Sequence, residues 1–167
     1  LVLDHTRIFR YRKYMLYLPP FPGRQWQDVT RWQGNEAPGM TVKRPIGKTI
    51  RLPDGSTAPL SAAYVGAGLL FTSGQLAFDD KGQLCTGDIT EQTRLCLENI
   101  RRLLEAESLS VQNIIKVTVW LTDTADFGGF NGAYSEFFGD HRPARSTVRS
   151  DLMLPGARVE IEAIAAC

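Results

Sequence analysis

The run RVEIEAIAA, residues 158–166, constrains the fold most, because its side chains alternate strictly along the chain. In a β-strand, successive side chains point to opposite faces of the sheet. The two faces are therefore Val159, Ile161, Ala163 and Ala165 on one side, and Glu160, Glu162, Ile164 and Ala166 on the other. Both faces carry groups that need a partner. One can pack on helices, and the other favours an oligomer.

A first amphipathic helix is expected in DITEQTRLCLENIRRLLEAE, residues 88–107. The carboxylate of Asp88 can cap the first turn, and Glu91 three residues later completes the pattern of a capping box. The apolar positions fall near one face, as in a helix that packs on a sheet. They are Ile89, Cys96, Ile100, Leu103 and Leu104.

A second helix is expected in ADFGGFNGAYSEFF, residues 125–138, with Asp123 and Thr124 as candidate caps. Its aromatic residues recur at steps of three and four: Phe127, Phe130, Tyr134 and Phe137. Each glycine inside a helix costs about 1 kcal/mol relative to alanine. We therefore expect Gly128, Gly129 and Gly132 to allow the close approach of another backbone.

The remaining periodic segments predict strands. They are residues 48–52, two strands on either side of Gly66–Gly68, and residues 113–121, 145–148 and 158–166, with turns at 53–56 and 79–82. The order is strands, helix, strand, helix, strands. Two helices covering one face of a mixed sheet give a two-layer α+β domain.

Residues 1–39 differ from the rest. They are basic and aromatic, contain Trp26 and Trp32, and show no clean period of 2 or 3.6. We expect them to be an upstream extension, followed by one domain over residues 40–167. The alternative is an N-terminal arm that packs its aromatic side chains on the body or on a neighbouring subunit.

Charge and composition exclude several classes of protein. The formal charge is +3 over residues 1–39 and −2 over residues 40–167, so the body lacks the basic face that nucleic-acid binding usually needs. Three cysteines without metal or redox spacing favour a reduced, cytoplasmic protein. With so few cysteines and histidines no zinc site is expected, and without a phosphate loop or dinucleotide motif no cofactor is expected. No apolar run approaches the roughly 18 residues that span a bilayer.

Arg145, in HRPARSTVRS at residues 141–150, is the first candidate for a functional residue. A guanidinium is always charged and can bind a carboxylate through two parallel hydrogen bonds. A buried, unpaired arginine is costly, so Arg145 needs an anionic ligand or an internal acid. The structural alternative is an ion pair with Glu160 or Asp151.

Glu160 is the second candidate, because burial within an apolar strand can raise the pKa of a carboxyl group towards the range useful for acid–base chemistry. The alternatives are a solvated carboxylate or a structural partner of Arg145, and Glu162 shares its face. In TSGQ, Ser73 offers a hydroxyl, and Gly74 permits a ligand to approach the backbone closely. On local evidence alone, a plain transition from strand to turn is the favoured explanation of TSGQ. A serine hydrolase is excluded because Phe71, not glycine, lies two residues before Ser73.

Six blocks, in order and spacing, resemble the RidA family, also called YjgF: LLFTSGQLAFD, TGDITEQTRLCLENIRRLLEA, KVTVWLTD, FNGAYSEFF, RPARSTV and VEIEAIA. The resemblance runs from about residue 57 to residue 167. It implies a chorismate-mutase-like fold and a homotrimer with clefts between subunits. It also implies hydrolysis of reactive enamines and imines, such as 2-aminoacrylate, to a keto acid and ammonia.

The resemblance also implies roles for particular residues. Arg145 would bind the substrate carboxylate, Glu160 would place or activate water, and Ser73, Gly74 and Asn131 would line the cleft. Two positions depart from the usual pattern, since Leu60 replaces a tyrosine and Thr147 replaces a cysteine. The segment STAPLS is similar to the RutC branch, which is linked to aminoacrylate handling. The alternative function is a non-catalytic module that binds a small carboxylate or a protein.

Overall fold

The computed structural model describes residues 43–47 and 55–167. All of them belong to one unit, Ala37–Cys167. The predictions for residues 1–39 and for a strand at 48–52 lie outside the described residues. Within the part of the chain that the structure describes, no helix is long and apolar enough to cross a membrane.

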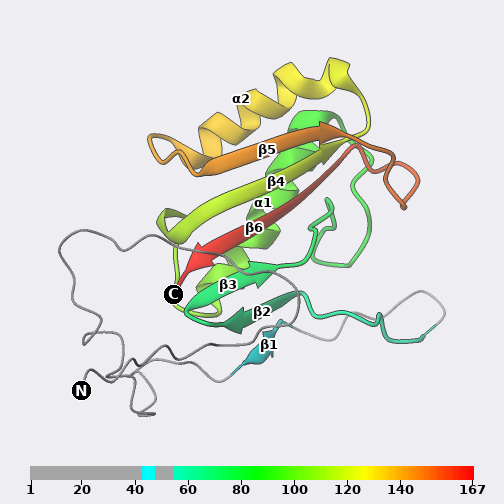
Figure 1. Cartoon of the computed structure of the whole chain (residues 1–167). Helices are drawn as coiled ribbons and strands as arrows, with labels where there is room; N and C mark the ends of the chain where they lie inside the picture. The colour runs from blue at the N-terminus through cyan, green and yellow to red at the C-terminus, as the bar shows by residue number, and fades with distance from the viewer. Residues whose placement is uncertain (1–42, 48–54) are drawn as a thin grey trace, which may run out of the picture. The chain divides into compact units, whose positions relative to one another are not determined.

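Six strands form one mixed sheet in the order β1-β2-β3-β6-β4-β5 (Figure 1). β6 is antiparallel to both of its neighbours, whereas β5 is parallel to β4. The parallel pair is joined by a helix, as such a crossover requires. The strands are β1 (Arg44–Ile46), β2 (Ala63–Gly66), β3 (Leu69–Thr72), β4 (Ile114–Leu121), β5 (Ala144–Arg149) and β6 (Val159–Ala166).

Helix α1 (Ile89–Glu105) begins with the predicted capping box. The carboxylate of Asp88 accepts a hydrogen bond from the Glu91 N–H at 2.9 Å, and the Glu91 carboxylate accepts one from the Asp88 N–H at 3.1 Å. Four of the five predicted core positions are buried, and Leu103 packs against the core while partly exposed. The prediction for this helix is confirmed.

Helix α2 (Phe127–Phe138) follows a short 3-10 turn, Thr124–Asp126. The carboxylate of Asp123 accepts a hydrogen bond from the Ala125 N–H at 2.9 Å, so it caps the 3-10 turn and not the helix. A second turn, Val111–Asn113, precedes β4. Both helices contribute to the core on one side of the sheet, which confirms the two-layer α+β fold (Figure 1).

The predicted alternation of β6 is confirmed. Val159, Ile161, Ala163 and Ala165 are buried, and the intervening side chains are partly exposed on the other face of the sheet. That open face also carries exposed apolar side chains, including Tyr64, Phe71 and Val148. A face of this kind is expected to meet another surface.

The explanation offered for the three glycines of α2, close approach of another backbone, is wrong for all three among the described residues. A Cβ at Gly128 or Gly132 would meet nothing within 4 Å. A Cβ at Gly129 would lie 2.7 Å from Cγ2 of Ile89, so this glycine admits a side chain of α1 and not a backbone. Gly129 therefore lets α2 pack closely on the start of α1.

The glycines give a matched pair of stability predictions. Gly129→Ala forces the buried Ile89 side chain to move, and overpacking of this kind costs about 1–3 kcal/mol. Gly132→Ala adds a methyl group to open space and gains helix propensity, so it should stabilise the protein by up to about 1 kcal/mol. Urea unfolding of both variants measures the difference. Equal effects of the two substitutions would contradict the packing of Gly129 on Ile89.

Candidate functional site

The two leading candidates, Arg145 and Glu160, point to opposite faces of the sheet. Arg145 pairs with Val117, which belongs to the core beneath the helices, so Arg145 lies on the helix side. Glu160 pairs with Trp120, which alternates with core residues of β4 and so lies on the open face. Within one chain, these two side chains do not form a common site.

Arg145 is exposed because β5 is the edge strand of the sheet. Its guanidinium lies over three aromatic rings of α2, with its central carbon 4.6 Å from the ring centre of Tyr134, 5.2 Å from Phe130 and 6.0 Å from Phe127. Cation–π contacts of this kind hold a charge without neutralising it. Among the described residues no acid forms an ion pair with Arg145, so the alternative of a structural salt bridge is not found.

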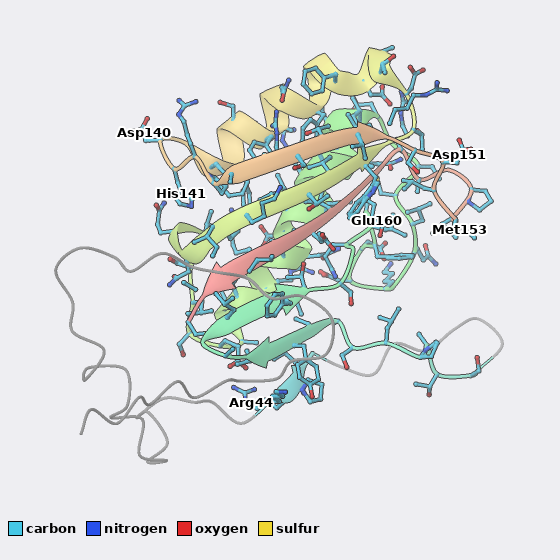
Figure 2. The ribbon with its side chains drawn as sticks, in the orientation of Figure 1. Arg44, Asp140, His141, Asp151, Met153 and Glu160 are labelled. Carbon is cyan, nitrogen blue, oxygen red and sulfur yellow. The ribbon has the colours of Figure 1, made fainter. Side chains whose placement is uncertain are left out.

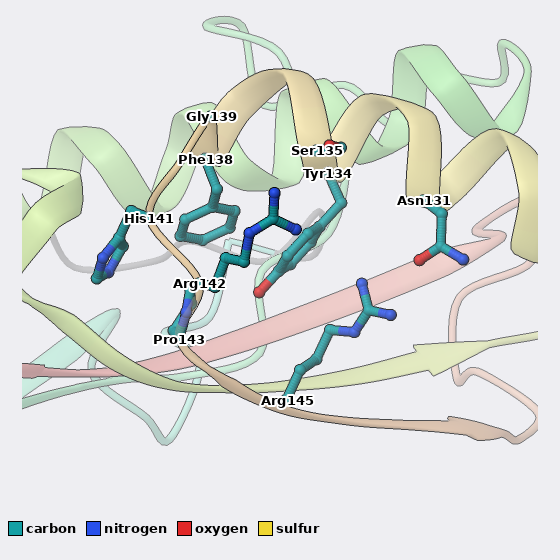
Figure 3. A pocket seen from close by; sticks show the side chains of 9 residues that line it. All are labelled: Asn131, Tyr134, Ser135, Phe138, Gly139, His141, Arg142, Pro143 and Arg145. Atoms are coloured by element: carbon teal, nitrogen blue, oxygen red, sulfur yellow. The ribbon is translucent and has the colours of Figure 1, made fainter.

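Arg145 and Asn131 line the same pocket, which has a volume of about 360 Å³ and lies between α2 and the start of β5 (Figure 3). Figure 3 shows the guanidinium of Arg145 extending from the strand towards Asn131 on the helix. The rest of the lining consists of Tyr134, Ser135, Phe138, Gly139, His141, Arg142 and Pro143. The structure therefore brings together two of the predicted site residues, Arg145 and Asn131.

Glu160, Gly74 and Ser73 form a second group on the open face. Glu160 lies near the start of β6 (Figure 2), and its carboxylate occupies the space where a side chain of Gly74 would be. A Cβ at Gly74 would lie 1.8 Å from Oε1 of Glu160. A side chain at position 74 would therefore displace the Glu160 carboxylate from its present position.

Burial raises the pKa of the Glu160 carboxyl group above its ordinary value, and the nearby charge of Glu162 raises it further. The protonated and charged forms of Glu160 are thus closer in free energy than for a solvated carboxyl group. A group of this kind can accept and return a proton.

Ser73 follows β3, and its hydroxyl donates a hydrogen bond to the carbonyl of Ser61 at 2.7 Å. Two residues later, Gln75 exchanges backbone hydrogen bonds of 2.7 and 3.1 Å with Ile161. These bonds fix the TSGQ segment beside Glu160. The conformation of this segment places Gly74 against the carboxylate of Glu160.

A buried network that was not predicted from the sequence holds residues 156–158, the segment that leads into β6 and Glu160. Gln92 of α1 is fully buried. Its side chain accepts a hydrogen bond from the Arg158 N–H at 2.9 Å and donates one to the carbonyl of Gly156 at 3.0 Å. Arg158 in turn donates to the buried Asp126 at 2.9 Å through Nε. A glutamine among leucines in an otherwise apolar helix face was the available signal.

The two departures from the family pattern occupy different places. Leu60 is 52% exposed and lies outside the core. Thr147 lies two residues after Arg145 on the same side of β5, and its buried hydroxyl has no hydrogen-bond partner. Cys96 is a core residue, as expected, with its thiol 3.8 Å from the carbonyl of Val159.

The sequence and the fold match known proteins. Residues 52–167 match the family model described as Endoribonuclease L-PSP. A RutC family protein of Pyrococcus horikoshii is 44% identical over 64% of this chain and 86% of its own. Human 2-iminobutanoate/2-iminopropanoate deaminase is 33% identical over 73% of this chain and 89% of its own.

A solved structure shows the same fold. The crystal structure of Escherichia coli TdcF with bound serine has a TM-score of 0.65 and 34% identity, and the match covers 74% of this chain and 98% of TdcF. The protein is therefore a member of the endoribonuclease L-PSP family, also known as the YjgF or RidA family. The family includes relatives named as deaminases of reactive imines.

The raised pKa of Glu160 predicts how stability depends on pH. The folded state holds this proton more tightly than the unfolded chain, so the free energy of unfolding falls as the pH rises from the ordinary carboxyl value of 4.5 through the raised pKa. Glu160→Gln removes the charge. We expect it to unfold at a higher temperature than the wild type at pH 7, with a smaller difference at pH 4.

Differential scanning calorimetry at equal protein concentrations measures this difference, and Glu105→Gln, at the exposed end of α1, is the control. A Glu160→Gln variant less stable than the wild type at pH 7 would mean that a cation stabilises the carboxylate.

Proposed function

We propose that the protein hydrolyses enamines and imines that carry a carboxylate, such as 2-aminoacrylate and its tautomer 2-iminopropanoate, to a keto acid and ammonia. The observation that carries the proposal is the guanidinium of Arg145, which lies in a pocket on three aromatic rings with no acid bound to it. The name of the human relative supports the choice of reaction.

The complete site forms, in this proposal, between two copies of the chain in a homotrimer. Arg145 and Asn131 of one subunit face Glu160, Ser73 and Gly74 of the next. Two observations support this arrangement: the two groups lie on opposite faces of one sheet, and the open face exposes apolar side chains. A cyclic assembly lets each chain contribute one group to each of two clefts.

The reaction needs few groups. The enamine gains a proton at its terminal carbon and loses one from nitrogen, which gives the imine. Water then adds to the imine carbon, and the resulting carbinolamine loses ammonia to leave the keto acid. Arg145 holds the carboxylate, and Glu160 accepts a proton from the attacking water and returns one to the leaving nitrogen. Orientation of this kind lowers a barrier by several kcal/mol.

A ribonuclease, which the description of the family model names, is the less favoured function for this chain. General acid–base cleavage of RNA commonly uses histidine, and His141 is the single histidine in residues 43–47 and 55–167. Its Nε2 lies 2.7 Å from the carbonyl of Ile114 and is therefore engaged in a structural hydrogen bond. The net negative charge of residues 40–167 also opposes RNA binding.

Loss of the Arg145 guanidinium should remove most of the enzymatic acceleration of 2-aminoacrylate hydrolysis. The assay generates 2-aminoacrylate in situ and follows the release of keto acid. Arg145→Ala should lower the rate above background at least about 100-fold, because the substrate carboxylate loses a charge-assisted bidentate contact. Arg101→Ala is a matched control, because Arg101 of α1 also lies over an aromatic ring. Its guanidinium carbon is 4.7 Å from the ring centre of Phe137 of α2. Equal rates for Arg145→Ala and the wild type would refute the carboxylate clamp.

Mixing two inactive variants tests whether neighbouring chains share the site. Arg145→Ala supplies a chain with Glu160 intact, and Glu160→Gln supplies one with Arg145 intact. After joint unfolding and refolding at equal amounts, random trimers should recover about a quarter of the wild-type activity, because one cleft in four receives both intact groups. No recovery, with trimers confirmed by mass in solution, would refute a site shared between neighbouring chains.

A further inference from the structure

The pocket that contains Arg145 holds a second guanidinium with no assigned role. Arg142 lines the same pocket, and Figure 3 shows its guanidinium and that of Arg145 on the two sides of the Tyr134 ring. No described acid forms an ion pair with either arginine, and the pocket lining contains no carboxylate. Two like charges without an internal counter-ion favour an anion between them.

Tyr134 adds a second and independent sign of a ligand. Its side chain lines the pocket, it is only 9% exposed, and its buried hydroxyl has no hydrogen-bond partner among the described residues. A buried hydroxyl of this kind costs about 1–3 kcal/mol when it stays unpaired. Burial also raises the pKa of Tyr134 to about 12, so the hydroxyl remains a donor at neutral pH. An anion that enters between the arginines would supply the missing acceptor.

The size of the pocket exceeds what a three-carbon substrate needs. Its volume of about 360 Å³ lies in the range of pockets that hold considerably larger ligands. Arg145 lies towards Asn131 at one end, and Arg142 lies towards His141 and Gly139 at the other. If the reacting carboxylate is bound by Arg145, the Arg142 end is left for the substrate side chain.

We propose that this pocket selects dianionic ligands: Arg145 binds the carboxylate next to the reacting carbon, and Arg142 with the Tyr134 hydroxyl binds an acidic group on the side chain. The substrate class is then imino acids of the size derived from aspartate and glutamate. Hydrolysis of such an imino acid consumes one water molecule and releases ammonia and a dicarboxylic keto acid, with the same stoichiometry as for 2-iminopropanoate. The assignment of substrates rests on the proposed deaminase function, whereas the binding of a dianion does not.

Binding of two matched acids tests the pocket directly. Glutarate and butyrate differ by one carboxylate, and titration of the full-length protein by calorimetry compares them. We expect glutarate to bind at least about tenfold more tightly than butyrate. Arg142→Gln should reduce this ratio to near one, and Tyr134→Phe, which removes only the hydroxyl, should reduce it several-fold. Arg94→Gln removes an exposed arginine that pairs with Glu136 and should keep the wild-type ratio.

The outcomes separate this proposal from the deaminase. A glutarate-to-butyrate ratio that is near one in the wild type, or unchanged in Arg142→Gln, overturns the dianion pocket even if 2-iminopropanoate is hydrolysed. A ratio that depends on Arg142, in a protein that hydrolyses no imine, supports the pocket and refutes the deaminase. Because Arg142 is exposed, its replacement leaves the core intact, and thermal unfolding checks this.

Discussion

Strand β6 is the constraint on which the rest of the structure depends. It hydrogen bonds to β3 on one side and β4 on the other, so it joins the hairpin half of the sheet to the half that carries α2. Its alternate side chains form the core on one face and present Glu160 on the other. A shift of one residue would exchange the two sets, bury the carboxylates and expose the core. The same pairing therefore fixes both the fold and the location of the acidic group.

The sequence was sufficient for most helices and strands of the domain because their signals are local, but β1 (Arg44–Ile46) was not predicted. The capping box at Asp88, the turn at Ala67 and Gly68, and the alternation of β6 each depend on residues close together in the chain, and all three were found as expected or nearly so. The approach of Gly74 to Glu160 involves residues 86 positions apart. No periodicity contains that information, and only the resemblance to a family placed both residues at one site.

Other features were beyond sequence reasoning for physical reasons. The helical spacing places Gln92 on the apolar face of α1, but its partners are backbone groups distant in sequence, which no sequence pattern reveals. The sequence predicted that Arg145 would need an internal acid or an anionic ligand. The structure instead places its guanidinium over aromatic rings, which do not neutralise the charge. The separation of the two groups onto opposite faces follows from strand register, and it turns a single predicted site into two halves.

The aromatic support of Arg145 has a consequence for how the pocket fills and empties. Where an arginine pairs with an internal carboxylate, each arriving anion must displace that carboxylate, and each departing one must let it return. Here the rings of Phe127, Phe130 and Tyr134 belong to one rigid helix and do not compete for the guanidinium hydrogens. If the pocket binds an anion as proposed, ligand exchange therefore requires no change of partner for Arg145 among the described residues.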